Sequence, residues 1–537
     1  MNRRRFIKHA AITGTGIFAI GAAVGLKEWF KDSTKIKITE HNLNSIGHKI
    51  RQPYTPHASP TIPTENIDVA IIGAGISGLS AAYFLEKSGF KNFKIFEMNQ
   101  VAGGNSEYFN TAKGKASWGA HYLPIIRNDD QLLNQFLTEN NIITGEQDGL
   151  PVYNEEYLCQ DPHERLFIRG RWQESLIPQA GLTAEAYQEI MAFLKFTNDL
   201  KNRKGSDGKY LFSIPVDESS SDPDFRKLDQ ISFKDFLVQK NWTSEALHWY
   251  ANYACQDDFG TKSDATSAWA GLHYFCARNG KAANADEQSV VTWPEGNGFL
   301  SDCLQKNIKP YLKLNMLVRN ISKKQNYFEV SLTDQKENKD LIYHAKKVIY
   351  CLPRYTAPYV IQDYPKSTDL NYYPWVISHI YVEKAALEKN HVLAWDTVRY
   401  LASDLGYINN YHQYLTQRTS DVLITFYSVF ADGTPSENRK KLATWGPEEI
   451  KNDLLSKFEK YHPGIQSAIK SIDYRVLGHG MISPSVNFLW SKRKAALKPE
   501  WNGIYFAHSD MSGISIFEEA FHQGHKAFLK VKNGSLA

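Results

Sequence analysis

The sequence predicts an α/β fold, in which a Rossmann-like domain with a three-layer, mostly parallel sheet carries an inserted α+β domain. Residues 67–96 read as strand, turn, helix and strand, and the nearly continuous apolar run at 67–72 is typical of a strand buried in a parallel sheet. Two long stretches, 151–287 and 363–495, separate this unit from later apolar strands. We therefore expect residues 66–150, 288–362 and 496–533 to build the first domain and the two insertions to build the second.

The turn of the first unit carries a glycine motif. Gly73, Gly75 and Gly78 form G-x-G-x-x-G between the strand and the helix. Gly73 permits a tight turn, Gly75 leaves the backbone open to a pyrophosphate, and Gly78 lets the helix pack against the strand. Ile76 and Ser77 begin the helix, whose N–H groups favour phosphate. The motif predicts a bound dinucleotide.

An acidic residue and a second glycine pair follow this unit. Glu97 ends the next strand, where its carboxylate can accept hydrogen bonds from both hydroxyls of an adenosine ribose. Gly103 and Gly104 come shortly after it. This arrangement resembles the flavin-containing amine oxidase superfamily, in which the glycine pair lies against the flavin and is commonly followed by arginine. The resemblance implies FAD as the cofactor.

Further stretches resemble the same superfamily in the same order, from about residue 66 to 530. "SWGAHYLP" places Ala120 at the small residue beside the flavin, and "GNGF" begins at Gly296. The strand bearing Val318 would hold the adenine by main-chain hydrogen bonds. Asp510 would bind the ribityl or pyrophosphate part, and the last helix, with Ala520 in its first turns, would point at the pyrimidine edge of the flavin.

The sequence departs from that pattern at several positions. Asn105 stands where arginine is usual, so the cation is lost and hydrogen bonding is kept. Glu519 replaces a glycine of the last helix, so its side chain must point away from the flavin or the helix must shift. Ser378 and His379 occupy the best counterpart of a lysine, and Ile516 falls near a position where monoamine oxidases have tyrosine.

Four residues are candidates for the chemistry, because flavin oxidation of an amine requires a group that takes up a proton. By motif position His121 and Tyr122 face the flavin, and His379 and His479 come from the inserted domain. A neutral histidine can accept a proton from an ammonium group. Asp257 and Asp258 are interpreted as part of a solvated turn without a role in the chemistry.

The N-terminus resembles an export signal sequence. Arg3 and Arg4, followed by Arg5, Phe6 and Ile7, match the twin-arginine consensus, and a short glycine-containing apolar stretch follows. We expect residues 1–30 to be a twin-arginine signal or a retained membrane anchor, and the Pro-rich segment 31–65 to be an extended linker. The protein would then be handled by the twin-arginine machinery and reside in the periplasm or at the outer face of the membrane.

Composition excludes some functions. The 62 Lys and Arg residues exceed the 58 Asp and Glu residues by only four, so no charge field for nucleic acid is expected. The five cysteines form no C-x-x-C pair, and no metal site is expected.

We predict an FAD-dependent oxidoreductase acting on an amine or another small organic donor. A carotenoid- or porphyrinogen-type dehydrogenase or isomerase, or a flavin-bound partner protein without turnover, remains as an alternative, and the oligomeric state stays open.

Overall fold

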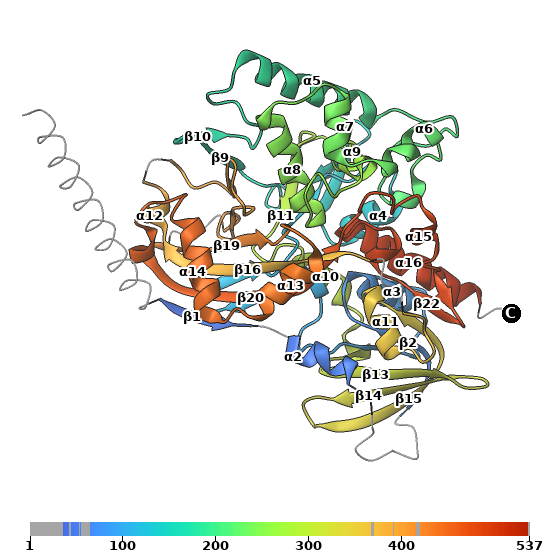
Figure 1. Ribbon diagram of the computed structural model, residues 1–537. Coiled ribbons are helices and arrows are strands. Elements are labelled where there is room, and N and C mark those ends of the chain that lie inside the picture. Colours follow the sequence, from blue (N-terminus) through green and yellow to red (C-terminus); the bar gives the residue numbers. More distant parts are fainter. Residues whose placement is uncertain are drawn as a thin grey trace, which may run out of the picture.

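The computed structural model describes residues 36–41, 44–52, 54, 65–366, 370–389, 391–414 and 419–534. Figure 1 shows two sheets with helices around them. The predicted export segment, residues 1–30, lies outside the described residues. Within the described part of the chain, no helix combines the length and the apolar character needed to cross a membrane.

The first sheet carries the glycine motif and confirms the predicted α/β class. Its parallel strands are β12 (Leu312–Lys313), β3 (Phe93–Phe96), β2 (Glu65–Ile72), β15 (Lys339–Tyr350) and β22 (Ile504–Phe506). Strands β14 (Phe328–Asp334) and β13 (Met316–Lys323) extend it as an antiparallel hairpin beyond β15. The apolar run at 67–72 is the buried end of β2, as a central parallel strand requires.

Two helices cross closely behind this sheet. They are α3 (Ile76–Lys87), which follows the glycine turn, and α16 (Phe517–Asn533), the last helix. Ser80 Oγ donates a hydrogen bond of 2.8 Å to the carbonyl of Phe521. A Cβ added at Gly524 would lie 2.3 Å from the Ser77 carbonyl oxygen, so only glycine allows the two backbones to approach this closely. The C-terminal helix is thereby fixed beside the glycine turn.

The second sheet belongs to the inserted domain. Its order is β1 (Lys37–Glu40), β20 (Ile469–Ile482), β16 (Tyr372–Glu383), β19 (Asp421–Val429), β18 (Tyr407–Asn409), β17 (Asp396–Arg399), β9 (Glu164–Ile168) and β10 (Arg171–Glu174). Helices α5 (Ala184–Lys201), α7 (Phe233–Gln239), α8 (Glu245–Phe259) and α9 (Ala268–Cys276) gather above it in Figure 1.

Shorter elements connect these parts. They are β4 (Tyr108–Thr111), β5 (Gly114–Ser117), β6 (Tyr122–Pro124), α4 (Gln131–Glu139), β7 (Ile143–Gln147), β8 (Leu150–Tyr153), α6 (Pro223–Arg226), β11 (Val290–Thr292), α10 (Gly298–Gln305), α11 (Ala357–Val360), α12 (Lys384–Leu387), α13 (Pro435–Ala443), α14 (Pro447–Phe458), α15 (Lys492–Ala495) and β21 (Glu500–Trp501).

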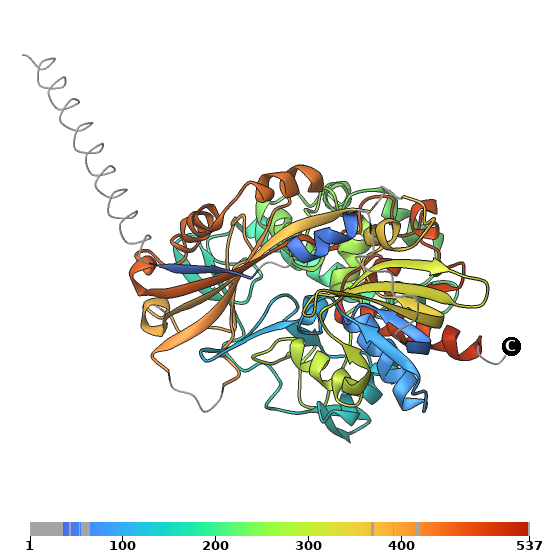
Figure 2. The same ribbon diagram turned by 90° about the horizontal axis from the view of Figure 1, so that it is seen from below.

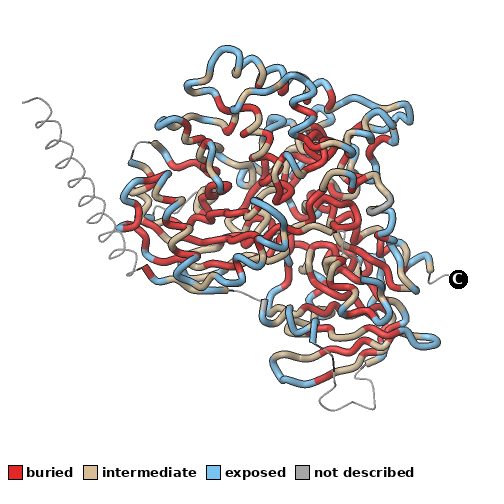
Figure 3. The backbone as a smooth tube through the Cα atoms, viewed as in Figure 1, coloured by how far each residue is buried: buried red, intermediate tan, exposed pale blue. Residues whose placement is uncertain are grey.

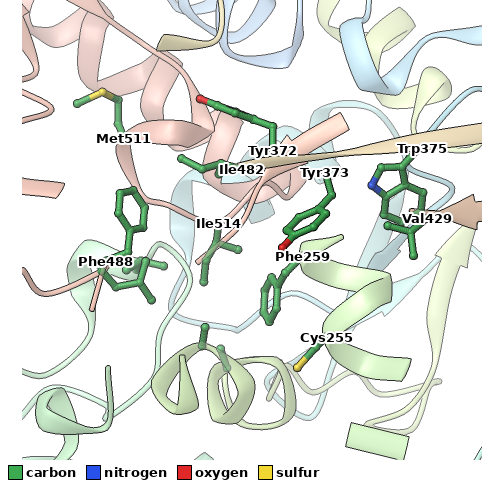
Figure 4. Close-up of a cluster of buried hydrophobic side chains, with 14 of the residues drawn as sticks. Cys255, Phe259, Tyr372, Tyr373, Trp375, Val429, Ile482, Phe488, Met511 and Ile514 are labelled. Atoms are coloured by element: carbon green, nitrogen blue, oxygen red, sulfur yellow. The ribbon is translucent and has the colours of Figure 1, made fainter. Parts of the chain in front are cut away.

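The largest core joins the helices of the inserted domain to both sheets. Figure 3 shows buried backbone concentrated where these parts meet. In Figure 4, Tyr373 of β16 lies beside Phe259 of α8. Gly260 ends α8 against Trp375, where a Cβ would come within 2.8 Å of the indole Nε1. This close contact packs the end of α8 directly against β16.

The segment predicted as a linker, 31–65, contains ordered structure, which corrects that prediction. Residues 36–41 and 44–52, here called the N-terminal strap, form β1, α2 (Asn44–Gly47) and the short 3₁₀ helix His48–Arg51. Strand β1 pairs in parallel with β20 (Figure 2). Ile36 is buried and Ile38 packs on the same domain. Alternating isoleucines in a polar segment give an edge strand, and the neighbouring prolines obscure this pattern in the sequence.

Candidate functional site

One cavity of about 1140 Å³ runs between the two domains. Its wall comes from the glycine turn and from β16, β20, α8 and the N-terminal strap. Among the predicted cofactor-binding residues, all except Gly78 line it, and these are Gly73, Gly75, Ile76, Ser77, Glu97, Gly103, Gly104, Asn105, Ala120, Val318, Asp510 and Ala520. Residues from distant parts of the chain thus meet around one space.

The three glycines of the turn have different surroundings. Gly73 has a φ of +97°, which disfavours any side chain. A Cβ at Gly78 would lie 2.0 Å from the Gly73 carbonyl oxygen, so this glycine serves packing. A Cβ at Gly75 would meet only Gly104 Cα, at 4.0 Å, and would point into open space. No side chain caps the N-terminus of α3, so its N–H groups are available to a phosphate.

Glu97 is held by the backbone at one end of the cavity. Its Oε2 accepts a hydrogen bond of 2.8 Å from Ala74 N, and its Oε1 accepts one of 2.9 Å from Asn99 N. Burial raises the pKa of this carboxyl, and the two backbone donors offset part of that rise. Because a carboxylate oxygen accepts more than one hydrogen bond, each oxygen retains capacity for a ribose hydroxyl.

The second glycine pair lies directly against the first turn. Gly103 forms a bridge with Gly75, and a Cβ at Gly104 would lie 3.1 Å from Gly75 Cα. Asn105 Nδ2 donates a hydrogen bond of 2.7 Å to the Gly480 carbonyl of β20. Its own carbonyl accepts from Ala120 N at 3.1 Å. Asn105 therefore ties the two domains together at the position where the superfamily usually has a cation.

Asp510 is a buried carboxylate on the cavity wall. Its Oδ2 accepts hydrogen bonds from Arg354 N at 2.8 Å and from the Tyr372 hydroxyl at 2.5 Å. Its Oδ1 is buried with no hydrogen bond within the described residues, and His508 Nδ1 lies 3.1 Å from it. Burial acts to raise the pKa of Asp510, but His508 and the hydrogen bonds to the carboxylate bring it below its usual value. An ionised carboxylate whose Oδ1 keeps acceptor capacity on the cavity wall fits the hydroxyl groups of a ribityl chain.

Three of the four candidate catalytic residues line the cavity. Burial lowers the pKa of His121 to about 4 and raises that of Tyr122, so both side chains are neutral near pH 7. His479 stacks on Tyr355 with ring centroids 4.2 Å apart. Burial and neighbouring cations lower the pKa of His479 to about 3.

His379 does not belong to this group, which corrects its prediction as a catalytic candidate. It is fully buried, Nε2 lies 3.0 Å from the Ser117 carbonyl oxygen, and the ring stacks on Trp118 at 3.9 Å. It does not line the cavity. Strand residues alternate between two faces, and a one-residue difference in register decides which face a side chain reaches.

Two carboxylates that the sequence suggests are solvated lie in the cavity instead. Asp257 and Asp258 are in the last turn of α8, and both line the wall. Asp258 binds Arg278 Nη2 through both oxygens, at 2.8 and 3.0 Å. Asp257 has no hydrogen bond or ion pair within the described residues, and burial together with Asp258 raises its pKa to about 7. The helical spacing of the aromatic residues before them is the signal that indicates a helix here.

The first turn of α16 adds a third carboxyl group. Glu518 lines the cavity with only 3% of its surface exposed, and its Oε1 is buried with no partner within the described residues. Burial raises the pKa of Glu518 to about 7. Glu519 points away, because its Oε1 accepts a hydrogen bond of 2.6 Å from Val216 N. Of the two expectations for Glu519, the structure has the one in which the side chain turns from the cavity.

Comparisons with known proteins agree with this fold. Residues 71–139 match the NAD(P)-binding Rossmann-like domain. No curated protein matches the chain in sequence. Among solved structures, a double mutant of putrescine oxidase is 16% identical with a TM-score of 0.63, covering 88% of this chain and 100% of its own. Cyclohexylamine oxidase from Brevibacterium oxydans IH-35A is 15% identical with a TM-score of 0.60 at the same coverage.

A third similar structure is a CLA-producing fatty acid isomerase from P. acnes, with 14% identity and a TM-score of 0.57, covering 86% of this chain and 98% of its own. At such identities the likeness concerns the fold. The chain has a Rossmann-like dinucleotide-binding domain within an amine oxidase-like fold.

Proposed function

We propose that this protein is an FAD-dependent oxidoreductase that oxidises an amine. The residues present fit the cofactor. Gly75 leaves open space beside the N-terminus of α3, Glu97 retains acceptor capacity for a ribose, and Asp510 Oδ1 is a buried acceptor that receives no hydrogen bond within the described residues. FAD, when bound, supplies an acceptor for a hydride equivalent.

The observation that carries the choice of an amine is the unpaired carboxylate of Asp257 in the same cavity as these dinucleotide-binding residues. Asp258 forms the ion pair with Arg278, so Asp257 and Glu518 have no ion-pair partner of their own within the described residues, although the Arg278 charge acts on both. Tyr122, Tyr427 and other aromatic side chains line the wall around them. Aromatic faces and a carboxylate together attract an ammonium group and exclude water.

The chain's own residues also provide for the proton. An amine must lose its proton before it can give up a hydride. Neutral His121 lies on the cavity wall near Tyr427, with ring centroids 5.3 Å apart, but its pKa of about 4 makes it a weak base. Glu518, whose pKa is about 7, is the better acceptor for that proton. Asp257 orients the donor, and Glu518 takes up its proton.

The test is an anaerobic titration of the purified yellow protein with amines. Bleaching of the flavin absorbance by a primary amine or polyamine, followed by peroxide when air is readmitted, is the expected result. If no amine bleaches a protein that does contain FAD, amine oxidation is wrong.

A second candidate is a carotenoid- or porphyrinogen-type dehydrogenase or isomerase. It is favoured by His379, which lies buried on Trp118 at the counterpart of the lysine found in amine oxidases. In the same titration, polyenes or porphyrinogens would then bleach the flavin, or be isomerised themselves, while amines would have no effect. A flavin-bound partner protein would respond to neither class of donor.

We further propose that the protein is exported by the twin-arginine route, on the basis of Arg3, Arg4 and the apolar stretch behind them. Changing both arginines to lysine should retain the protein in the cytoplasm, which cell fractionation measures. Unchanged export of that variant would contradict the proposal.

A further inference from the structure

The N-terminal strap covers the part of the cavity that holds the dinucleotide-binding residues. Strand β1 pairs with β20 from Lys37 opposite Ser471 to Glu40 opposite Tyr474. The strap then reaches the first domain, where a Cβ at Gly47 would lie 3.8 Å from Met98 Cε. Met98 directly follows Glu97, the predicted ribose acceptor. The strap thus bridges both domains over one side of the cavity.

Cations gather where the strap meets α13. His48 and Arg51 of the strap, Arg439 of α13 and His479 of β20 all line the cavity. Besides burial, the charges that lower the pKa of His479 are those of Arg439, Arg51 and His48. Arg51 likewise acts to lower the pKa of both His48 and Arg439. Arg51 and Arg439 are therefore neighbouring cations, and His48 and His479, whose pKa values are lowered, are neutral imidazoles beside them near pH 7.

No carboxylate compensates this cluster. Within the described residues, neither His48, Arg51 nor Arg439 forms an ion pair with an acidic side chain. Glu40, the strap's own carboxylate on the cavity wall, is engaged with the Tyr474 hydroxyl. Like charges held together without a counter-charge create a positive potential that favours an anion.

Hydrogen bonds connect the cluster to the middle of the dinucleotide path. Arg439 Nη1 donates 2.6 Å to the Tyr372 carbonyl, and the Tyr372 hydroxyl donates to Asp510. On the other side, Asn105 binds the carbonyl of Gly480, the residue after His479. The cluster therefore adjoins Tyr372 and Gly480, whose own partners, Asp510 and Asn105, are predicted cofactor-binding residues.

We infer that the N-terminal strap is part of the cofactor site and that its Arg51, together with Arg439, provides the positive charge for the pyrophosphate of FAD that Asn105 does not provide. The strap covers the dinucleotide half of the cavity, and its Arg51 adds to the positive charge that the N-terminus of α3 offers the phosphates. This inference rests on the proposed function only in taking FAD as the ligand.

The test measures cofactor binding, without a substrate. Apoprotein carrying Arg51→Glu is compared with the unchanged chain by titration of FAD and, separately, of riboflavin, which has no phosphate. We expect the Kd for FAD to rise about tenfold, and more at low ionic strength than at high, while the Kd for riboflavin stays constant. The matched control is Lys49→Glu, because Lys49 is exposed on the same 3₁₀ helix and does not line the cavity.

An unchanged Kd for FAD in Arg51→Glu would overturn the inference, and so would equal weakening of riboflavin, since shape and not charge would then be responsible. Equal loss of FAD in Lys49→Glu would also overturn it. If the unchanged chain binds no FAD, the proposed function itself fails. Deleting residues 36–52 should speed the release of FAD, followed by flavin fluorescence.

Discussion

Asp257 shows how the surroundings of one residue set its chemical role. The carboxyl group lies on the cavity wall, and burial with a neighbouring carboxylate raises its pKa to about 7. Only the ionised form attracts an ammonium group. Substrate binding is therefore coupled to a titration near neutral pH.

We predict that Asp257→Asn raises KM for a cationic amine by about tenfold or more, with a smaller change in kcat. In the unchanged enzyme, KM should fall as pH rises through about 7, because Asp257 becomes ionised. The variant should keep only the weaker dependence that Glu518, with a pKa of about 7, contributes. Steady-state kinetics over a pH range of about one unit on each side of the Asp257 pKa measure both effects. The control is Asp199→Asn, because Asp199 is an exposed residue of α5.

Two glycines three residues apart should respond differently to alanine. Gly75→Ala places its Cβ in open space, so the apoprotein should keep its stability and lose FAD affinity. Gly78→Ala places its Cβ 2.0 Å from a carbonyl oxygen and should destabilise the fold by about 3 kcal/mol. Thermal unfolding of the apoproteins and FAD titration separate the two effects. Equal stability loss in both variants would contradict this assignment.

Helix α16 is anchored to the start of α4 by the pair His522 and Asp130. His522 Nε2 lies 2.7 Å from Asp130 Oδ2, and Asp130 also caps α4 through Leu133 N. Burial acts to lower the pKa of His522, but the Asp130 hydrogen bond together with the charges of Asp130, Glu519 and Glu218 makes the net shift upward. A raised pKa in the folded state means that protonation stabilises the fold.

This contribution should be fully present below the unfolded pKa of His522, about 6.5, and should be lost as pH rises through the higher folded value. His522→Gln should therefore cost about 1 to 2 kcal/mol near pH 5.5 and less near pH 8.5. Urea unfolding at both pH values measures the difference. A cost that grows with pH would contradict the assignment.

A buried ion pair also joins the two domains. Arg475 of β20 binds both oxygens of Glu107, which precedes β4, at 3.1 and 3.0 Å, and the guanidinium lies over Trp118. Both residues are more than nine-tenths buried. Removing one partner would leave a buried, unpaired charge.

We predict that Arg475→Met destabilises the protein by about 3 to 5 kcal/mol, and that adding Glu107→Met restores much of this loss. Equilibrium unfolding of both single variants and the double variant gives the free energies of a double-mutant cycle. Additive losses would show that the two side chains act independently.

The residues that sequence reasoning locates are those whose role is local. The glycine turn and Glu97 belong to one β-α-β unit, so their spacing alone brings them together, and Gly73, Gly75 and Glu97 line the same cavity. Asp257 requires the pairing of α8 with a distant domain, and β1 requires the edge of β20, more than 400 residues away in the chain. His379 depends on strand register, which a hydrophobic pattern on both faces leaves undefined.

The pairing of β1 with β20 also limits where the chain can be shortened. Ile36 is buried and Lys37 begins the pairing, so any maturation cut, purification tag or truncation must stay on the N-terminal side of these residues. A protease cut after Glu40 would separate β1 from the part of the strap at Gly47 that reaches Met98. The N-terminus of the stable protein should accordingly lie before residue 36, a boundary that mass spectrometry of the purified protein can read directly.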